Sequence, residues 1–418
     1  MVLLILAGVS ISLILDNNGI IKRSKDARKQ YGEAQANEQE QMGDISDWID
    51  EQATGKVSEK VKNFKTAKDE NTTINGEEGN SNNPTIPAGY VPINTDTSNW
   101  GDGSSAPTQD SVDHGLVIRD GNNNEWVWVP VPDVTVMCDT SNQTEYTLCG
   151  TTGETAVKTK LYSKSEIISG QKRTTPGTTT DPYFREPDIV VGSAGASFDA
   201  QEKYYKTILG ETGSKEQLAQ LFVDEYKAMI ESVSKYGGFY IGRYELSEAG
   251  VQKNKPTLTS INTNWYNLYN ACKDTKLQAS DKVETRMIWG CQWDVACNFI
   301  ANKGDKKDIT DSRSWGNHND STGDAKVVVT ENGAETNKYR TKQNTGYSEY
   351  WKANNIYDLA GNCLEWTQEA YGTNYRVYRG GCCYYSGSDH PASNRIVNSP
   401  GNGNVDVFMR FSSHFNNK

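Results

Sequence analysis

The sequence has few of the residues and motifs that most metal centres and hydrolases require. It contains four histidines, and none of its eight cysteines forms a C-x-x-C pair, so a zinc ribbon or a thioredoxin-type site has no support. No G-x-S-x-G motif is present, and no Ser-His-Asp arrangement can be argued. The net charge is −11 and the single basic run lies in residues 22–29, so we do not expect nucleic acid as a partner.

The chain also lacks an apolar run long enough for an ordinary membrane span, which takes about twenty residues. Residues 2–15 are apolar or small, with no basic stretch before them and no A-x-A cleavage site after them. A charged, amphipathic helical pattern follows directly. This arrangement resembles the stem helix of type IV pilins, and we assign residues 1–41 to such a stem. A single-pass anchor and a signal peptide are the alternatives.

All three interpretations place the body of the protein outside the membrane, at the surface of a bacterial cell. The membrane, reached through the N-terminal helix, and pilus subunits are therefore expected partners. Residues 42–110 have few apolar side chains and many Gly, Asn, Thr, Ser and Pro residues, which predicts a flexible stalk. The remaining residues, 111–418, are expected to form the folded domain.

Local patterns predict the first elements of this domain. Residues 116–118 and 126–129 are β-branched and aromatic runs on either side of D-G-N-N-N, which predicts a hairpin. Ser214 and Gln217 fit a capping box, so we expect a helix to begin there. Gly237, in the following double glycine, is expected to end it.

Three further segments complete the prediction of secondary structure. Residues 265–272 and 292–300 are expected to form short helices with aromatic faces, and residues 137–200 a surface insertion rich in Thr and Gly. Because helices precede a loop-rich, strand-poor end, the sequence predicts an α+β fold.

A dense motif follows between residues 355 and 381. Its parts are Asn355-Ile356-Tyr357-Asp358, Gly361-Asn362, Glu365-Trp366 and Arg379-Gly380-Gly381. This stretch resembles the signature of the formylglycine-generating enzyme (sulfatase-modifying factor) family. The resemblance implies a C-type-lectin-like fold, rich in irregular loops. It does not imply activity, because the family includes copper-dependent oxidases, related iron enzymes and many non-enzymes.

The sequence departs from the oxidases at the positions that matter for their chemistry. In those enzymes two cysteines follow the double glycine, at the positions occupied here by Tyr385 and His390. A pair of thiolates is what binds and activates copper(I), because soft sulfur ligands suit the soft ion. We therefore expect no catalytic residues, and keep a formylglycine-generating oxidoreductase that uses unconventional residues as an alternative.

The C-terminal segment, residues 382–417, has an unusual composition. It contains no Glu, Gln, Lys or Trp and a single Met, Met409. The residue types reachable from an Asn codon by changing only its adenines exclude these same types. This pattern, together with R-G-G, S-G-S-x-x-P-A-S-x-R and a terminal F-x-R, resembles the variable proteins of diversity-generating retroelements. The alternative is an ordinary surface loop, which is also rich in Gly, Asn and Ser.

The resemblance implies a ligand-binding face and a fixed frame beneath it. The residues expected to bind ligand are Cys382, Cys383, Tyr384, Tyr385, Asp389, His390, Asn394, Ile396, Val397, Asn398, Asn402, Asn404, Val405, Val407 and Phe408. Tyr and Asn supply amphipathic contact area and adaptable hydrogen bonds, as in antibody-like binding sites. The frame is expected to consist of Arg379, Gly380, Gly381, Arg395 and Arg410, because arginine forks can hold loops through carboxylates and carbonyls.

A structural calcium ion is the one cofactor that the resemblance suggests. Asn362 and Glu365 match a calcium-binding turn of the family, and Ca²⁺ requires hard oxygen ligands close together. The alternative is that Asn362 stabilises the turn and Glu365 pairs with an arginine such as Arg379.

The sequence thus predicts a non-catalytic binding or adhesion protein displayed on the cell surface. Its C-terminal face is expected to contact an unknown extracellular protein or surface ligand. A minor pilus component with a purely structural role is the remaining alternative.

Overall fold

The computed structural model describes most of the expected domain. The described ranges are residues 67–94, 109–134, 137, 159–161, 184–186, 206–247, 250–253, 255, 264–273, 283–331, 334–337, 340–371, 375–401 and 407–415. The chain divides into two units, residues 1–64 and 65–418, and every described residue belongs to the second. The predicted stem over residues 1–41 and most of the predicted insertion lie outside these ranges.

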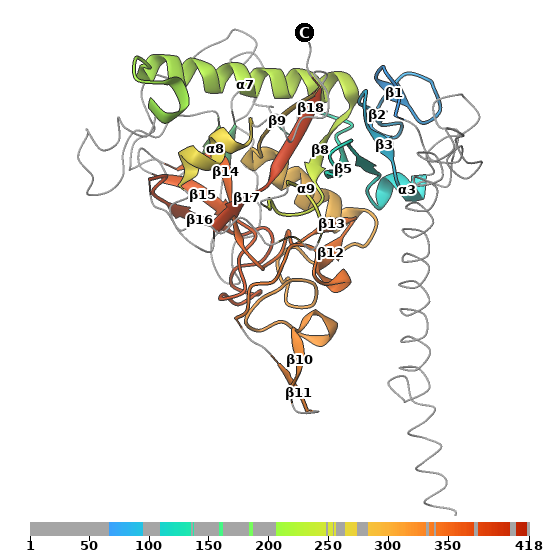
Figure 1. The fold of residues 1–418 in the computed structure, drawn as a ribbon, viewed down its shortest axis with the longest axis vertical. Helices are drawn as coiled ribbons and strands as arrows, with labels where there is room; N and C mark the ends of the chain where they lie inside the picture. The colour runs from blue at the N-terminus through green and yellow to red at the C-terminus, as the bar shows by residue number, and fades with distance from the viewer. Residues whose placement is uncertain are drawn as a thin grey trace, which may run out of the picture. The chain divides into compact units, whose positions relative to one another are not determined.

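A six-stranded antiparallel sheet forms the centre of the second unit (Figure 1). Its order is β3 (Val91–Pro92), β4 (Val117–Arg119), β5 (Glu125–Pro130), β8 (Gly238–Gly242), β18 (Phe411–Phe415) and β9 (Val283–Met287). The predicted hairpin is confirmed, because β4 and β5 pair with Ile118 opposite Trp126. The last strand, β18, lies between β8 and β9 and pairs with both.

Helix α7 (Lys215–Tyr236) covers one end of this sheet, as Figure 1 shows. The predicted capping box is present, because the Ser214 side chain accepts a hydrogen bond from Gln217 N and the Gln217 side chain accepts one from Ser214 N. The helix ends at Gly237, whose φ of 75° is the left-handed conformation favoured at this position. Both predicted termini are therefore confirmed.

Further helices and 3₁₀ turns lie in the described ranges besides α7. They include α3 (Gln109–Asp113), α8 (Trp265–Ala271), α9 (Gly290–Asn302), η3 (Gly323–Ala325) and η4 (Glu349–Trp351), and residues 206–209 are also helical. Helices α8 and α9 confirm the two predicted short helices, and α9 is buried on nearly all sides. No helix within the described ranges is long and apolar enough to cross a membrane.

A second six-stranded sheet carries the dense motif. Its order is β16 (Arg395–Asn398), β15 (Tyr375–Arg379), β14 (Leu364–Tyr371), β7 (Phe184–Glu186) and β6 (Thr159–Leu161), and β17 (Val407–Met409) pairs with β14 in parallel. Three two-stranded ribbons complete the strands: β1 (Thr72–Thr73) with β2 (Thr85–Ile86), β10 (Val328–Glu331) with β11 (Ala334–Asn337), and β12 (Lys352–Ala353) with β13 (Ile356–Tyr357). The described part of the chain is thus a mixed helix-and-strand fold with small sheets and long loops.

Residues 67–94 differ from the flexible stalk that composition predicts. Ile74, Ile86 and Tyr90 are buried and belong to the main hydrophobic core. The Tyr240 hydroxyl donates a hydrogen bond to Thr85 O at 2.8 Å, and Trp128 Nε1 donates one to Ser81 O at 3.0 Å. A few well-spaced apolar residues therefore anchor this polar segment. Composition does not reveal such an anchor, because the anchoring residues follow neither a helical nor a strand period.

Candidate functional site

The dense motif forms a turn that leads into β14. Asp358, Gly361 and Asn362 all adopt left-handed backbone conformations, with φ of 56°, 78° and 56°. A Cβ at Gly361 would lie 2.3 Å from Asn317 O, so no other residue fits there without backbone movement. Asp and Asn adopt the left-handed backbone conformation more readily than most other residues do. The motif therefore encodes a tight turn at a fixed place.

Asn362 is the junction of four chain segments. Its main-chain N–H donates to Asn317 O at 2.9 Å, and its Oδ1 accepts N–H groups from Asn317 Nδ2 and Gln343 N, each at 3.0 Å. Its Nδ2 donates to Glu245 Oε2 at 2.6 Å. Cys383 N donates to Asn362 O at 3.1 Å. One buried asparagine, through its side-chain amide and its main chain, thus links the loops near residues 245, 317, 343 and 383.

A cluster of buried carboxyl groups surrounds this junction. Burial raises the pKa of Glu245 well above its ordinary value, and the negative charges of Asp358 and Glu365 raise it further. Burial also raises the pKa of Asp358 to about 6 and that of Glu365 to about 7, against the opposing charge of Arg410. Three carboxyl groups thus face one guanidinium, and the cluster retains protons near neutral pH.

Arg410 ties this cluster to the first sheet. It donates from Nε to Glu365 Oε2 at 2.9 Å and from Nη2 to Glu365 Oε1 at 2.7 Å. It also donates to Gly242 O at 2.9 Å and to Tyr357 O at 2.8 Å. Glu365 therefore pairs with an arginine, as the alternative to a calcium site predicted, but the partner is Arg410 and not the suggested Arg379.

The two residues suggested for calcium are engaged with protein donors. Asn362 Oδ1 accepts two N–H groups and both Glu365 oxygens accept from Arg410. Within the described ranges, no group of three or more His, Cys, Asp or Glu residues is placed to hold a metal ion.

A second buried network supports the R-G-G motif. Arg379 and Arg395 both donate to the Asp294 carboxylate on α9, and Arg395 Nε donates to Glu369 Oε1 at 3.0 Å. Glu186 accepts the N–H groups of Gly290 and Cys291 at the start of α9. Burial raises the pKa of Glu186 to about 8, with a contribution from the negative charge of Glu369.

Gly381 has a specific steric role in this motif. Its φ is 72°, and a Cβ there would lie 2.1 Å from His390 O. The glycine therefore lets the chain return closely on itself between residues 381 and 390. The expected frame residues Arg379, Gly380, Gly381, Arg395 and Arg410 all lie in these two supporting networks or in the turn between them.

The structure separates the expected ligand-binding residues by exposure. Tyr384, Tyr385 and Asp389 are exposed, whereas His390, Ile396, Val397 and Asn398 are partly buried. Cys382, Cys383 and Asn394 are buried, so their side chains are enclosed by the fold and not presented on its surface. Asn402, Asn404 and Val405 lie outside the described residues, and of Val407 and Phe408 only the backbone, in β17, is described. One continuous contact face over the whole segment is therefore not what the structure shows.

The polar loop S-W-G-N-H-N-D, residues 314–320, holds the exposed tyrosines in place. Asn319 N donates to Tyr385 O at 3.1 Å, and Asn319 Nδ2 donates to Tyr384 O at 2.7 Å. Asp320 accepts from the Ser386 hydroxyl at 2.6 Å and from Gly387 N at 2.7 Å. The polar S-W-G-N-H-N-D stretch contained the signal, because its side chains can bond the main chain of a neighbouring loop.

The exposed aromatic residues are concentrated on two loops. The exposed large hydrophobic side chains of the described residues are Tyr347 (52%), Tyr350 (50%), Tyr384 (42%) and Tyr385 (39%). Tyr384 follows Cys383, and Tyr347 lies shortly after Gln343. Both loops are therefore attached to Asn362, and sequence reasoning identified the tyrosines of only one of them.

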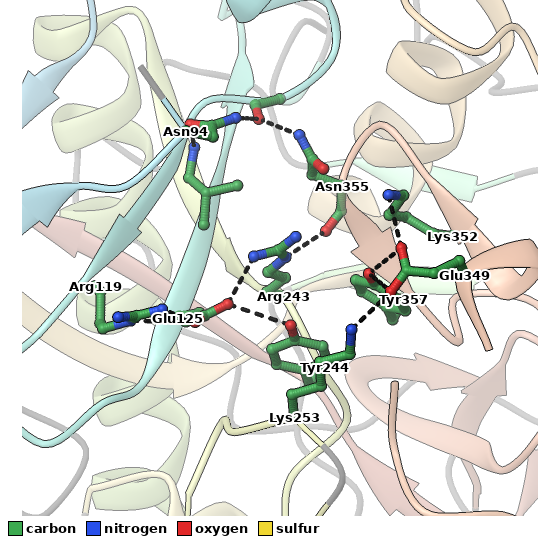
Figure 2. Close-up of polar contacts among 12 residues, drawn as sticks. Asn94, Arg119, Glu125, Arg243, Tyr244, Lys253, Glu349, Lys352, Asn355 and Tyr357 are labelled. Carbon is green, nitrogen blue, oxygen red and sulfur yellow. Dashed lines mark hydrogen bonds and ion pairs between the residues drawn. The ribbon is translucent and has the colours of Figure 1, made fainter. Parts of the chain in front are cut away.

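A chain of ionic contacts fixes the loop that carries Tyr347 and Tyr350 (Figure 2). Glu349 accepts from Lys253 Nζ at 2.6 Å, Lys352 Nζ at 2.9 Å and the Tyr357 hydroxyl at 2.6 Å. Burial raises the pKa of Glu349, but these hydrogen bonds outweigh it and hold the pKa at about 2. Glu349 is therefore charged at neutral pH and retains its three donors.

Figure 2 also shows a second set of contacts, centred on Glu125 in the first sheet. Glu125 on β5 accepts from Arg119 and Arg243, each at 2.7 Å, and from the Tyr244 hydroxyl at 3.2 Å. Burial raises the pKa of Glu125, and the charges of Arg243 and Arg119 lower it further than burial raises it. Arg243 Nε also donates to Asn355 O at 3.3 Å, which joins β8 to the start of the dense motif.

No model of a known protein family matches the chain, and no curated protein matches it. Among solved structures, it is similar to Treponema denticola variable protein 1, with 14% identity and a TM-score of 0.25, over 43% of this chain and 85% of that one. CarF gives 12% identity and a TM-score of 0.27, over 43% and 87%. The Major Tropism Determinant I1 variant gives 14% and 0.26, over 43% and 51%. Similarity at this level assigns neither a fold nor a function.

Proposed function

We propose that this chain is a non-catalytic binding protein whose loop face around Asn362 contacts an extracellular protein or another surface ligand. The observation that carries the proposal is the distribution of exposed aromatic residues. All four exposed large hydrophobic side chains in the described ranges are tyrosines, and all lie on the two loops bonded to Asn362. Tyrosine offers a large, rigid, amphipathic contact area at little entropic cost, which is why binding sites favour it.

The support beneath this face favours binding over a passive loop. The loop with Tyr384 and Tyr385 is held by Asn319 and Asp320, and the loop with Tyr347 and Tyr350 by the contacts of Glu349. Loops ordered before binding lose less entropy when a partner arrives. The buried arginine–carboxylate networks of Arg379, Arg395 and Arg410 hold the frame from which these loops project, as a preorganised binding site requires.

We also propose that the C-terminal segment is diversified and that the scaffold which presents it is lectin-like. The N-terminal segment would hold the protein at the cell surface. Exposed positions such as Tyr384, Tyr385 and Asp389 can change without disturbing the core. Gly381 and Arg395 cannot change in this way, because one meets His390 O and the other pairs with Asp294 and Glu369 in the interior. The structure thus predicts which positions tolerate variation.

Deep sequencing of the DNA that encodes residues 370–418, from many cells of one strain, tests this function. We expect substitutions at Tyr384, Tyr385 and Asp389, confined to adenines of a template repeat, with Gly381 and Arg395 unchanged. Buried Cys382 and Cys383 should vary less than their exposed neighbours. An invariant sequence in every cell would show that the segment is not diversified. A binding role would then require a single fixed ligand.

A further inference from the structure

His318 lies directly beneath the loop of residues 382–390, and binding as proposed above makes no use of it. The side chain is 3% exposed. Glycines enclose the ring, because a Cβ at Gly316 would lie 2.8 Å from Nε2, one at Gly381 3.1 Å from Cε1, and one at Gly387 2.7 Å from Cδ2. The ring therefore fits a closed space with no room for the water that a charged imidazole requires.

The hydrogen bonds of His318 and its neighbours are the anchors of this loop. Ser312 Oγ lies 3.0 Å from His318 Nε2, and Ser312 N donates to Gly387 O at 3.0 Å. Asn319 and Asp320, which follow His318 directly, bond the loop from Tyr384 to Gly387. Any displacement of His318 therefore moves the residues that hold Tyr384 and Tyr385.

The charged groups around His318 do not provide a full counter-charge. The carboxylate of Asp320 favours the protonated ring, whereas the nearby imidazole of His390 opposes it. Asp311 also faces His318, but its carboxylate is engaged by Arg313 at 2.6 Å. The main chain of Cys382 and Tyr385 favours protonation. Burial outweighs all of these and lowers the pKa of His318 to about 4.

We infer that His318 is a pH-sensitive latch: protonation expels its ring from beneath the loop and releases residues 383–390, while the sheets and helices stay folded. The opening itself follows from the enclosure of the ring and from the shared anchors. Its consequence, the loss of a binding surface at acid pH, rests on the proposed function.

The direction of the effect follows from the two states of the histidine. In the open loop the ring is solvated and has the ordinary pKa of 6.5, whereas in the closed loop the pKa is about 4. Protons therefore bind more tightly to the open state, and opening becomes more favourable as the pH falls below 6.5. Between pH 7.5 and pH 5 this difference increases the opening equilibrium by about 30-fold.

Hydrogen exchange of the full-length chain at pH 7.5 and pH 5 tests this inference. The reporters are the amides of Cys383, Tyr385, Gly387 and His390, all of which donate hydrogen bonds in the closed loop. After correction for intrinsic exchange, we expect their protection to fall by about 30-fold at pH 5, with helix α7 unchanged. The His318→Gln variant should lose this dependence, and His114→Gln, at an exposed histidine, should keep it.

Three results would overturn the latch. They are equal loop protection at the two pH values, an equal loss in α7, and a His318→Gln variant with the pH dependence of the unmodified chain. If His318→Gln does not fold, the ring signals of the unmodified chain replace it, and a His318 titration that does not coincide with loop opening rejects the latch.

The latch and the proposed function fail in different ways. Binding that needs Tyr384 but is insensitive to pH would reject the latch alone. Loop opening in a chain whose segment is invariant and binds nothing would reject the function alone.

Discussion

Two buried titratable regions beneath the loop face respond to acid in opposite directions. One is the carboxyl cluster of Glu245, Asp358 and Glu365, and the other is His318. Burial disfavours the charged form in both, so it raises the pKa of the acids and lowers that of the histidine. Burial of titratable groups can therefore make one region of a molecule more stable in acid and another region less stable.

The signs can be worked out for each region. Asp358 and Glu365 have folded-state pKa values of about 6 and 7, above their ordinary 3.8 and 4.5, so the folded state binds their protons more tightly. Their contribution to stability is complete at acid pH and is lost as the pH rises through 6 to 7. The His318 contribution is complete above pH 6.5 and is lost as the pH falls toward 4. Mild acid should therefore open the loop before it unfolds the frame.

The largest expected effect concerns the buried carboxyl cluster. Replacing Arg410 by Met leaves Glu365 buried without its partner and removes donors to Gly242 O and Tyr357 O. We expect a loss of about 3–5 kcal/mol in the free energy of unfolding at pH 8, measured by urea denaturation. At pH 5 the loss should be smaller, because Glu365 is then protonated. A matched Arg313→Met variant, at an exposed ion pair, should change little, and an equal loss in both variants would contradict the role of Arg410.

The next effect concerns the junction residue. Asn362→Asp keeps the size and the left-handed backbone but replaces the Nδ2 donor that faces Glu245 by an oxygen. We expect a destabilisation of about 2–3 kcal/mol at neutral pH, and less at pH 5, where the added carboxyl is protonated. Thermal unfolding at the two pH values measures it, with exposed Asn344→Asp as the control. A pH-independent loss would show that the carboxyl cluster does not respond as described.

The third prediction concerns the exposed tyrosines of the loop that His318 supports. Replacing both Tyr384 and Tyr385 by Ala should weaken binding to intact bacterial cells by about 10- to 100-fold, because exposed aromatic residues dominate contact energies. The free energy of unfolding should fall by no more than about 1 kcal/mol, because Tyr385 loses its ring contact with His390. Flow cytometry with labelled chain measures binding, and Tyr375→Ala, at the start of β15, is the control. Undiminished binding in the double variant would place the contact surface elsewhere.

The smallest expected effect sharpens the loop side further. His390 stacks on Tyr385, with ring centroids 4.4 Å apart. Removing this contact in His390→Gln should lower loop protection at pH 7.5 by about 2- to 5-fold, in keeping with about 0.5–1 kcal/mol for a ring pair. The pH dependence should remain, because His318 is intact. A loss of that dependence in His390→Gln would move the latch from His318 to His390.

Local chemistry allowed part of the fold to be predicted from the sequence. The hairpin of β4 and β5 and both ends of α7 follow from turn and capping residues that act within a few positions. The core position of Ile74, Ile86 and Tyr90 was missed, because their partners are distant in sequence and their spacing has no period.

The candidate site was harder to predict for the same reason. The backbone register does set Glu365 opposite Arg379, yet Glu365 pairs with Arg410 and Arg379 with Asp294 on α9. The importance of Asn319, Asp320 and Tyr347 depends on which loops meet at Asn362. Contacts between loops that are distant in the sequence are set by the tertiary fold, so no local sequence pattern predicts them.

The position of β18 has a consequence for synthesis. Because Phe411–Phe415 fills the gap between β8 and β9, the central sheet stays open until this strand has been synthesised. A frameshift or stop codon in the preceding loops would remove this strand, and the product would present unpaired edges to the quality-control proteases of the cell. The order of the strands thus makes closure of the central sheet depend on synthesis of β18, the last of its strands along the chain.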